Sequence, residues 1–305
     1  MSEFLSTDFV RLLAATLAAT NCAILGNQLV LRREAMLLDA LSHSVLPGLV
    51  VAFWAVQSTD PIAMLVGGVT AGLASVLLIG VLGQRTPIDS GTRIGSVFSV
   101  FFSVGILLFK LILPEKVHIS ADCVLEGELE RLIWIVPAEV SPWSLEGLGH
   151  LPGALGVQVA ALLASIAMLV ALRKELRMMT FDPGFAHTQG FRPQWVQLLL
   201  MAWVAIAAVA AFKALGSILV IALFVGPPAA ARLISSTERS MLLWSLALAL
   251  AAAWIGPPLA TDGLPRLGLP SVSAAGLLAA VSALPVLGLT WRGSSGTSPG
   301  APSGE

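Results

Sequence analysis

One stretch of the sequence places an acid, an imidazole and a proline at helical spacing inside an apolar run. Asp39, His43 and Pro47 follow one another at intervals of four residues, so on a helix they share one face. Pro47 cannot donate a hydrogen bond to the His43 carbonyl and should kink the helix there. A carboxylate, an imidazole and a freed carbonyl are oxygen and nitrogen ligands that suit Mn²⁺, Fe²⁺ or Zn²⁺. The stretch therefore predicts a divalent-metal site.

One copy of this stretch supplies two side-chain ligands, Asp39 and His43, whereas a divalent ion usually takes about four to six ligands. A second subunit presenting the same face, or water, would have to complete the coordination. The alternative interpretation is that the two side chains pair only with each other or cap neighbouring backbone. An ionisable residue inside a membrane helix is a functional candidate by default, which favours the metal site.

The rest of the chain has the composition of a membrane protein. Only 11% of its 305 residues are charged, compared with about 25% in soluble proteins. Its net charge of −1 argues against a nucleic-acid partner, because phosphate binding needs clustered basic residues. Runs of roughly the 20 residues that span a bilayer as a helix occur at 9–31, 36–56, 61–83, 94–113, 152–172, 241–258 and 270–290. We expect an all-α, polytopic membrane protein with eight to nine transmembrane helices.

The remaining apolar stretch, 195–231, is too long for one crossing. As a single helix it would be about 55 Å long, well beyond a hydrocarbon core of ~30 Å. Lys213, Gly216 and Ser217 mark the expected break, and Pro227-Pro228 disturbs the second half by removing backbone donors. The stretch predicts two short crossings, or one crossing and a re-entrant piece.

Basic residues orient the predicted helices. With the 32–35 loop in the cytoplasm, nine alternating crossings place most of the 17 Lys and Arg residues inside, as the positive-inside rule requires. The N-terminus is then outside and the C-terminus inside. We expect a transmembrane domain over 1–292 and a disordered cytoplasmic tail over 293–305, which is rich in Ser, Gly and Pro.

Two predicted loops are long enough to have roles of their own. The outer loop, 114–151, is strongly acidic, which suits it to attracting cations or docking a partner. The inner loop, 173–194, is basic at its start. Within the inner loop, Asp182 followed by Pro183 predicts a helix N-terminus on the cytoplasmic surface.

Common enzyme signatures are absent from the sequence. It contains no G-K-[ST] phosphate loop and no H-E-x-x-H zinc motif. We therefore expect that this chain does not bind ATP through a phosphate loop.

Four stretches are similar, in order, to the integral-membrane permease subunits of bacterial ABC importers for manganese, zinc and iron. Residues 39–48 (DALSHSVLPG) resemble the second-helix signature of that family, and 89–99 (DSGTRIGSVFS) resemble the start of its fourth helix. The segment 181–186 (FDPGFA), with Gly190 after it, resembles the cytoplasmic coupling segment, and 213–233 resembles the late-helix block. The likeness covers roughly residues 9 to 290.

The resemblance implies a set of partners and roles. A second permease subunit, identical or different, would form a pore with this chain, a cytoplasmic ATP-binding subunit would hydrolyse ATP, and an extracytoplasmic metal-binding protein would deliver the ion across the plasma membrane. The metal-contacting Asp and His of the family fall on Asp39 and His43. The coupling segment falls on Phe181, Asp182, Pro183, Phe185 and Gly190. The chain itself would be a transport subunit and no enzyme, with no resident cofactor. The ion would be its cargo, with manganese favoured over zinc or iron.

Two other mechanisms remain alternatives. A secondary, proton-coupled cation transporter could use Asp39 as its proton carrier and would need no ATPase. An intramembrane hydrolase would have only Asp39 and His43, without a nucleophile at a recognisable spacing.

Overall fold

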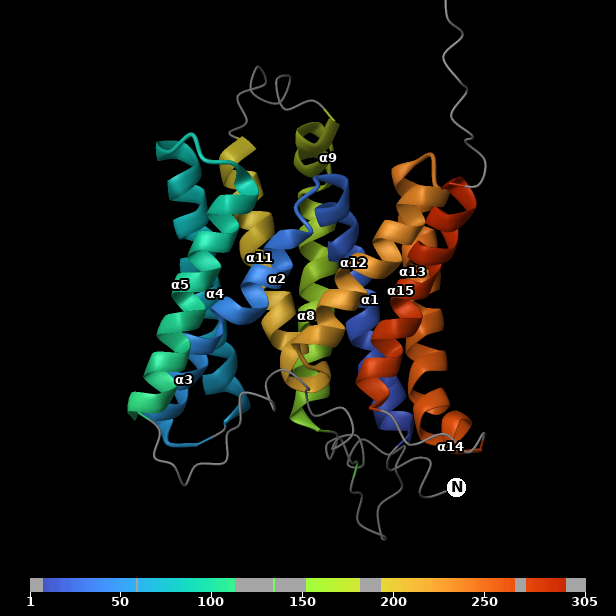
Figure 1. Ribbon diagram of the computed structural model, residues 1–305, viewed down its shortest axis with the longest axis horizontal. Helices are drawn as coiled ribbons and strands as arrows, with labels where there is room; N and C mark the ends of the chain where they lie inside the picture. The colour runs from blue at the N-terminus through green and yellow to red at the C-terminus, as the bar shows by residue number, and fades with distance from the viewer. Residues whose placement is uncertain are drawn as a thin grey trace, which may run out of the picture.

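The protein is a single bundle of membrane-length helices (Figure 1). The computed structural model describes residues 8–58, 60–112, 134, 152–181, 193–266 and 273–294, and these residues contain helices and no strand. The all-α prediction is confirmed. The helices are α1 (Phe9–Leu31), α2 (Met36–Ser44), α3 (Leu46–Val56), α4 (Pro61–Arg85), α5 (Ser90–Ile112), α8 (Gly153–Ala171), α9 (Arg173–Phe181), α11 (Pro193–Leu215), α12 (Ser217–Ile234), α13 (Glu238–Pro258), the π-helical turn η3 (Leu259–Gly263), α14 (Leu264–Arg266) and α15 (Ala274–Ser294).

Among the described residues, eight helical segments are long and apolar enough to cross a membrane, with α2 and α3 together forming one of them. A shorter apolar helix, Ala274–Thr290, lies within α15. The prediction of eight to nine transmembrane helices is therefore confirmed by length and composition.

The long apolar stretch breaks where the sequence predicts. Gly216 separates α11 from α12 and has a φ of 82°, a left-handed conformation that residues with a side chain rarely adopt. Figure 1 shows α11 and α12 running in opposite directions through the bundle. Because each contains a span of 18 residues, two crossings fit this stretch better than a re-entrant piece.

Pro227 and Pro228 do not end helix α12, which continues to Ile234. Proline has a helical φ, so the pair removes only the donors for the carbonyls of Leu223 and Phe224. The freed Phe224 carbonyl packs against Gly26 of α1, where an added Cβ would lie 2.0 Å from its oxygen. The absence of a side chain at Gly26 thus allows α1 and α12 to approach closely.

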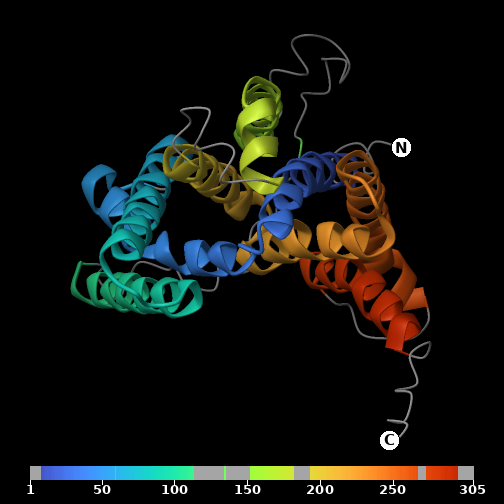
Figure 2. The ribbon, with the colours of Figure 1, turned by 90° about the horizontal axis from the view of Figure 1, so that it is seen from above.

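Helix α1 lies among α8, α11, α12 and α13 (Figure 2). Its buried face carries small residues, namely Ala14, Ala15, Ala18, Ala19 and Ala23. Small side chains let helices pack closely in a bilayer, where the hydrophobic effect does not drive them together. Helix α1 is therefore the packing centre for this half of the bundle.

The two ends of the bundle differ in charge. Figure 1 shows that the end of α1, the end of α4 and helix α9 lie at one end of the bundle, together with the end of α15, opposite the start of α1. Most of the described basic residues belong to segments at that end: Arg32, Arg33, Arg85, Arg93, Arg173, Lys174, Arg177, Arg232 and Arg239. This distribution agrees with the predicted orientation, in which that end faces the cytoplasm.

The close contact between α1 and α12 leads to a prediction about stability. Gly26→Ala should lower the free energy of unfolding by about 1 to 3 kcal/mol, because the new methyl group would collide with the Phe224 carbonyl. The control is Gly80→Ala in α4, where nothing lies within 4 Å of an added Cβ. Alanine is the better helix former, so this variant should be at least as stable as the parent. Thermal unfolding in detergent measures both, and equal stability of the two variants would contradict the prediction.

Candidate metal site on helix α2

The helix that carries the predicted ligands is interrupted next to them. Helix α2 ends at Ser44 and α3 begins at Leu46, so Val45 separates them. Pro47 lies in the first turn of α3, where a missing N–H removes no helical hydrogen bond. The predicted disruption at Pro47 is thus confirmed as a break at Val45. Figure 1 shows α2 at mid-height in the bundle.

Asp39 and His43 lie on one face of α2, as their spacing predicts. His43 Nε2 is 3.9 Å from Asp39 Oδ1, which is too far for a hydrogen bond. The Asp39 side chain is 67% exposed and that of His43 is 28% exposed. The two groups are close enough to share an ion, and the separation leaves both sets of lone pairs available.

Two phenylalanines of α5 pack against the His43 imidazole. The centroid of the Phe98 ring is 5.2 Å from that of His43, and the Phe102 ring is 5.3 Å away, edge to face at 73°. The two phenylalanine rings are 6.0 Å apart. Such contacts stabilise aromatic pairs by about 0.5 to 1.5 kcal/mol beyond area burial, so they hold the imidazole in place beside Asp39.

Sequence reasoning missed these two residues. Phe98 and Phe102 are spaced by four in an apolar run, a pattern that packing alone explains. One signal was available, because Phe98 falls within 89–99, one of the four stretches that carry the family resemblance.

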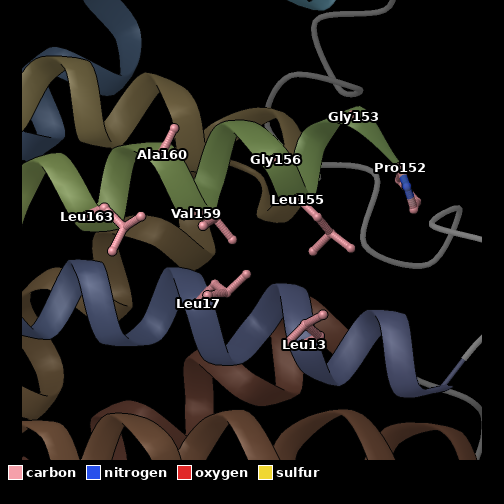
Figure 3. Close-up of a pocket in the computed structure, with 9 residues that line it drawn as sticks. All are labelled: Leu13, Leu17, Pro152, Gly153, Leu155, Gly156, Val159, Ala160 and Leu163. Atoms are coloured by element: carbon pink, nitrogen blue, oxygen red, sulfur yellow. The ribbon is translucent and has the colours of Figure 1, made fainter. Parts of the chain in front are cut away.

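Among the residues that the structure describes, no further His, Cys, Asp or Glu joins Asp39 and His43 in a cluster. Within the part of the chain that the structure describes, no group of three or more His, Cys, Asp and Glu side chains could hold a metal. A groove of about 520 Å³ between α1 and α8 (Figure 3) is lined only by apolar residues and glycines, among them Leu13, Leu17 and Leu163. It has no ligand chemistry, so Asp39 and His43 remain the candidate site.

Only part of the predicted coupling segment is described. Phe181 is the last residue of α9, whereas Asp182, Pro183, Phe185 and Gly190 lie outside the described residues, as does the predicted helix start at Asp182. Helix α9 is a separate short helix that the sequence analysis did not predict. In the outer loop, 114–151, the structure describes only Trp134, which is buried and lies 6.4 Å from Phe9 between ring centroids.

The turn between α1 and α2 fixes where α2 begins. Arg33 has a left-handed φ of 61°, its N–H bonds to the Val30 carbonyl, and the N–H of Glu34 bonds to the Leu29 carbonyl. These are the two hydrogen bonds of a Schellman motif, which closes a helix with a fixed change of direction. The Glu34 carbonyl then accepts from Leu37 N at 3.0 Å in the first turn of α2.

Arg32 and Glu34 lie in this turn between two membrane spans, and both side chains are partly buried. Burial raises the pKa of the Glu34 carboxyl, although the nearby Arg32 and a hydrogen bond from Gln197 oppose the shift. Burial also lowers the pKa of the Arg32 guanidinium, against the attraction of Glu34. The fold therefore disfavours the ionised carboxylate of Glu34 relative to the unfolded chain.

The fold and the site together define a polytopic helical membrane protein that carries Asp39 and His43 on an interrupted helix. The profile of the ABC 3 transport family matches residues 5–129 and 155–262. The match covers more than half of the chain, so the chain belongs to this family. The resemblance to metal importer permeases is thereby confirmed at the level of the family.

Individual relatives and a solved structure agree with this assignment. The zinc transport system membrane protein TroD of Treponema pallidum is 36% identical over 216 residues, which cover 70% of this chain and 56% of TroD. The manganese transport system membrane protein MntD of Bacillus subtilis is 31% identical over 229 residues, 75% of each chain. The structure of PsaBC from Streptococcus pneumoniae in complex with Fab has a TM-score of 0.71 at 22% identity, covering 92% of this chain and 89% of the other, which shows a shared fold.

The aromatic contacts of His43 predict a role for Phe102 at the site. Phe102→Leu should weaken binding of Mn²⁺, used as a probe, by about two- to tenfold, because the imidazole loses its edge-to-face contact. Isothermal titration of the purified protein measures the change. Phe109→Leu, farther along α5, is the matched control and should bind as the parent does. If Phe102→Leu binds Mn²⁺ as tightly as Phe109→Leu does, the contact between Phe102 and His43 does not organise the site.

The pKa shift of Glu34 predicts a pH-dependent change in stability. Because the folded pKa is raised, ionisation of Glu34 costs stability above the ordinary glutamate value of about 4.3. Glu34→Gln removes this cost and keeps an acceptor for Gln197. The variant should therefore have a higher Tm than the parent at neutral and alkaline pH, and the difference should vanish at acidic pH. If the Tm difference between Glu34→Gln and the parent instead grows as the pH falls, the prediction is contradicted.

Proposed function

We propose that this chain is the permease subunit of an ATP-driven importer that moves a divalent transition metal into the cytoplasm. The observation that carries the proposal is the pair Asp39 and His43, 3.9 Å apart on the interrupted helix α2, in a member of the ABC 3 transport family. Relatives named as zinc and manganese transport proteins support a transition metal as cargo. Manganese is favoured, with zinc and iron as alternatives.

The exposure of Asp39 supports assembly with a second permease subunit. A carboxylate that is 67% exposed in a span of a single chain must meet water or a partner, because bare contact with lipid is costly. A second copy presenting its own α2 would add another carboxylate and imidazole. Four side-chain ligands would then surround an ion on the shared axis, which meets the usual coordination number.

We expect one of the remaining partners at each end of the bundle. At the basic end, the segment 173–194 would receive the cytoplasmic ATP-binding subunit, with contacts from Phe181, Asp182, Pro183, Phe185 and Gly190. At the opposite end, an extracytoplasmic metal-binding protein would deliver the ion. ATP binding and hydrolysis would then switch access to Asp39 and His43 from the outer side to the inner side of the plasma membrane.

The metal site is tested by removing each ligand. Asp39→Asn and His43→Ala should each abolish metal accumulation while leaving membrane expression intact, because the ion loses a charged or a nitrogen ligand at its constriction. Elemental analysis of cells that express the chain with its partner subunits measures accumulation. Met36→Leu, on the exposed surface of the same helix, is the control and should accumulate metal normally. Normal accumulation in both ligand variants would overturn the assignment.

The coupling role is tested separately from the metal site. Phe181→Ala or Asp182→Ala should leave the complex assembled but reduce the metal moved per ATP hydrolysed, because the segment would no longer transmit movement. Lys174→Gln, at an exposed position of α9, is the control.

Purification in mild detergent decides against the secondary-transporter alternative if an ATP-binding subunit remains bound in stoichiometric amount. Loss of that subunit together with proton-driven uptake would favour the alternative.

A further inference from the structure

The turn between α1 and α2 connects two other helices, α9 and α11, to the start of α2. Arg32 Nη2 donates a hydrogen bond to the main-chain carbonyl of Leu176, in α9, at 3.2 Å. Gln197 Nε2, in α11, donates to Glu34 Oε1. The Glu34 carbonyl is itself an acceptor in the first turn of α2. One short turn therefore joins α9, α11 and α2.

The turn is stiff, and polar atoms of Arg32 and Glu34 within it have little access to water. The Schellman hydrogen bonds fix the backbone around Arg33. Arg32 Nε and Glu34 Oε2 are buried, and neither has a hydrogen-bond partner within the described part of the chain. Where water is excluded, loss of a hydrogen bond is expensive because no solvent replaces the partner. The side chains should therefore move together with the helices that they join.

A second polar contact of α9 has a different character. Arg177 Nε is 3.0 Å from Glu238 Oε2, at the start of α13, but the Arg177 side chain is 51% exposed. Exposed ion pairs contribute little, about 0 to 1 kcal/mol. The hydrogen bond from Arg32 to Leu176 is thus more buried than the ion pair between Arg177 and Glu238. Arg32 also lies in the turn that precedes the helix of Asp39.

We propose that Arg32, Glu34 and Gln197 form a junction that transmits displacement of α9 to α2, with Glu34 as the positioning residue. Helix α9 is the first part of the segment 173–194 that would receive the ATP-binding subunit, and Asp39 lies five residues after Glu34. A shift of α9 pulls on Arg32 through the Leu176 carbonyl. Because the turn is stiff, the start of α2 moves with it while Gln197 holds Glu34 against α11. This inference rests on the proposed function and assigns residues to its coupling step.

The test compares variants that break and preserve the contact to Gln197. Glu34→Ala and Gln197→Leu each remove the hydrogen bond from a different side, whereas Glu34→Gln keeps an acceptor at the same place. Arg33→Asn is the control within the turn, because the Arg33 side chain is exposed and asparagine tolerates a left-handed φ. Each variant is purified with its ATP-binding subunit, reconstituted into vesicles with the metal-binding protein, and assayed for Mn²⁺ uptake and ATP hydrolysis.

The expected result is a loss of coupling without a loss of assembly. Glu34→Ala and Gln197→Leu should lower the Mn²⁺ moved per ATP hydrolysed by about five- to tenfold, within the usual range of coupling between sites, and the double variant should be no worse than either single one. Glu34→Gln and Arg33→Asn should couple as the parent does. Subunit stoichiometry and basal ATP hydrolysis should be unchanged throughout.

Two results would overturn the proposal, and they differ from failure of the proposed function. Parent-like Mn²⁺ uptake per ATP in Glu34→Ala and Gln197→Leu would remove the junction from the coupling pathway. Loss of bound ATP-binding subunit in these variants would show a merely structural role. If the parent protein itself moves no metal or retains no ATP-binding subunit, the proposed function has failed, whatever the variants do.

Discussion

The cost of placing a carboxylate inside a bilayer is the constraint on which the rest of this structure depends. An ionised acid at the depth of a membrane helix is destabilising unless it meets a cation, a polar partner or water. The Asp39 side chain is 67% exposed, and the His43 imidazole is too far away to hydrogen-bond with it. The single chain therefore leaves the Asp39 charge incompletely compensated. This is expected of a site that binds a metal ion and receives further ligands from a second subunit.

Several irregularities of the backbone serve that site. The break at Val45 lets α2 take its own direction between the long helices, and the left-handed Arg33 sets where α2 begins. Gly216 turns the chain back so that α12 can pack against α1. A bundle of uninterrupted helices would have no short segment at mid-height that could move independently. The interruptions thus position Asp39 and His43, and under the proposed function they would also supply the freedom that alternating access requires.

Much of this arrangement could be predicted from the sequence because the physical signals are local. The lengths of apolar runs give the spans, Gly216 marks a break, and the spacing of Asp39 and His43 gives a shared helix face. Contacts between distant segments leave no such signal. Apart from the position of Phe98 within 89–99, nothing in the sequence separates Phe98 and Phe102 from other apolar residues of α5. The hydrogen bond between Gln197 and Glu34 joins residues far apart in the chain. The close approach of the Phe224 backbone to Gly26 likewise joins two segments far apart in the chain.

The most direct measurement for the central claim is pulsed electron paramagnetic resonance of Mn²⁺ bound to the assembled transporter, with its histidines labelled with ¹⁵N. Direct ligation by His43 predicts a hyperfine coupling between the manganese and an imidazole nitrogen, which disappears in His43→Gln while the subunits stay assembled. A bound Mn²⁺ without nitrogen coupling, or a coupling that persists in His43→Gln, would contradict the account.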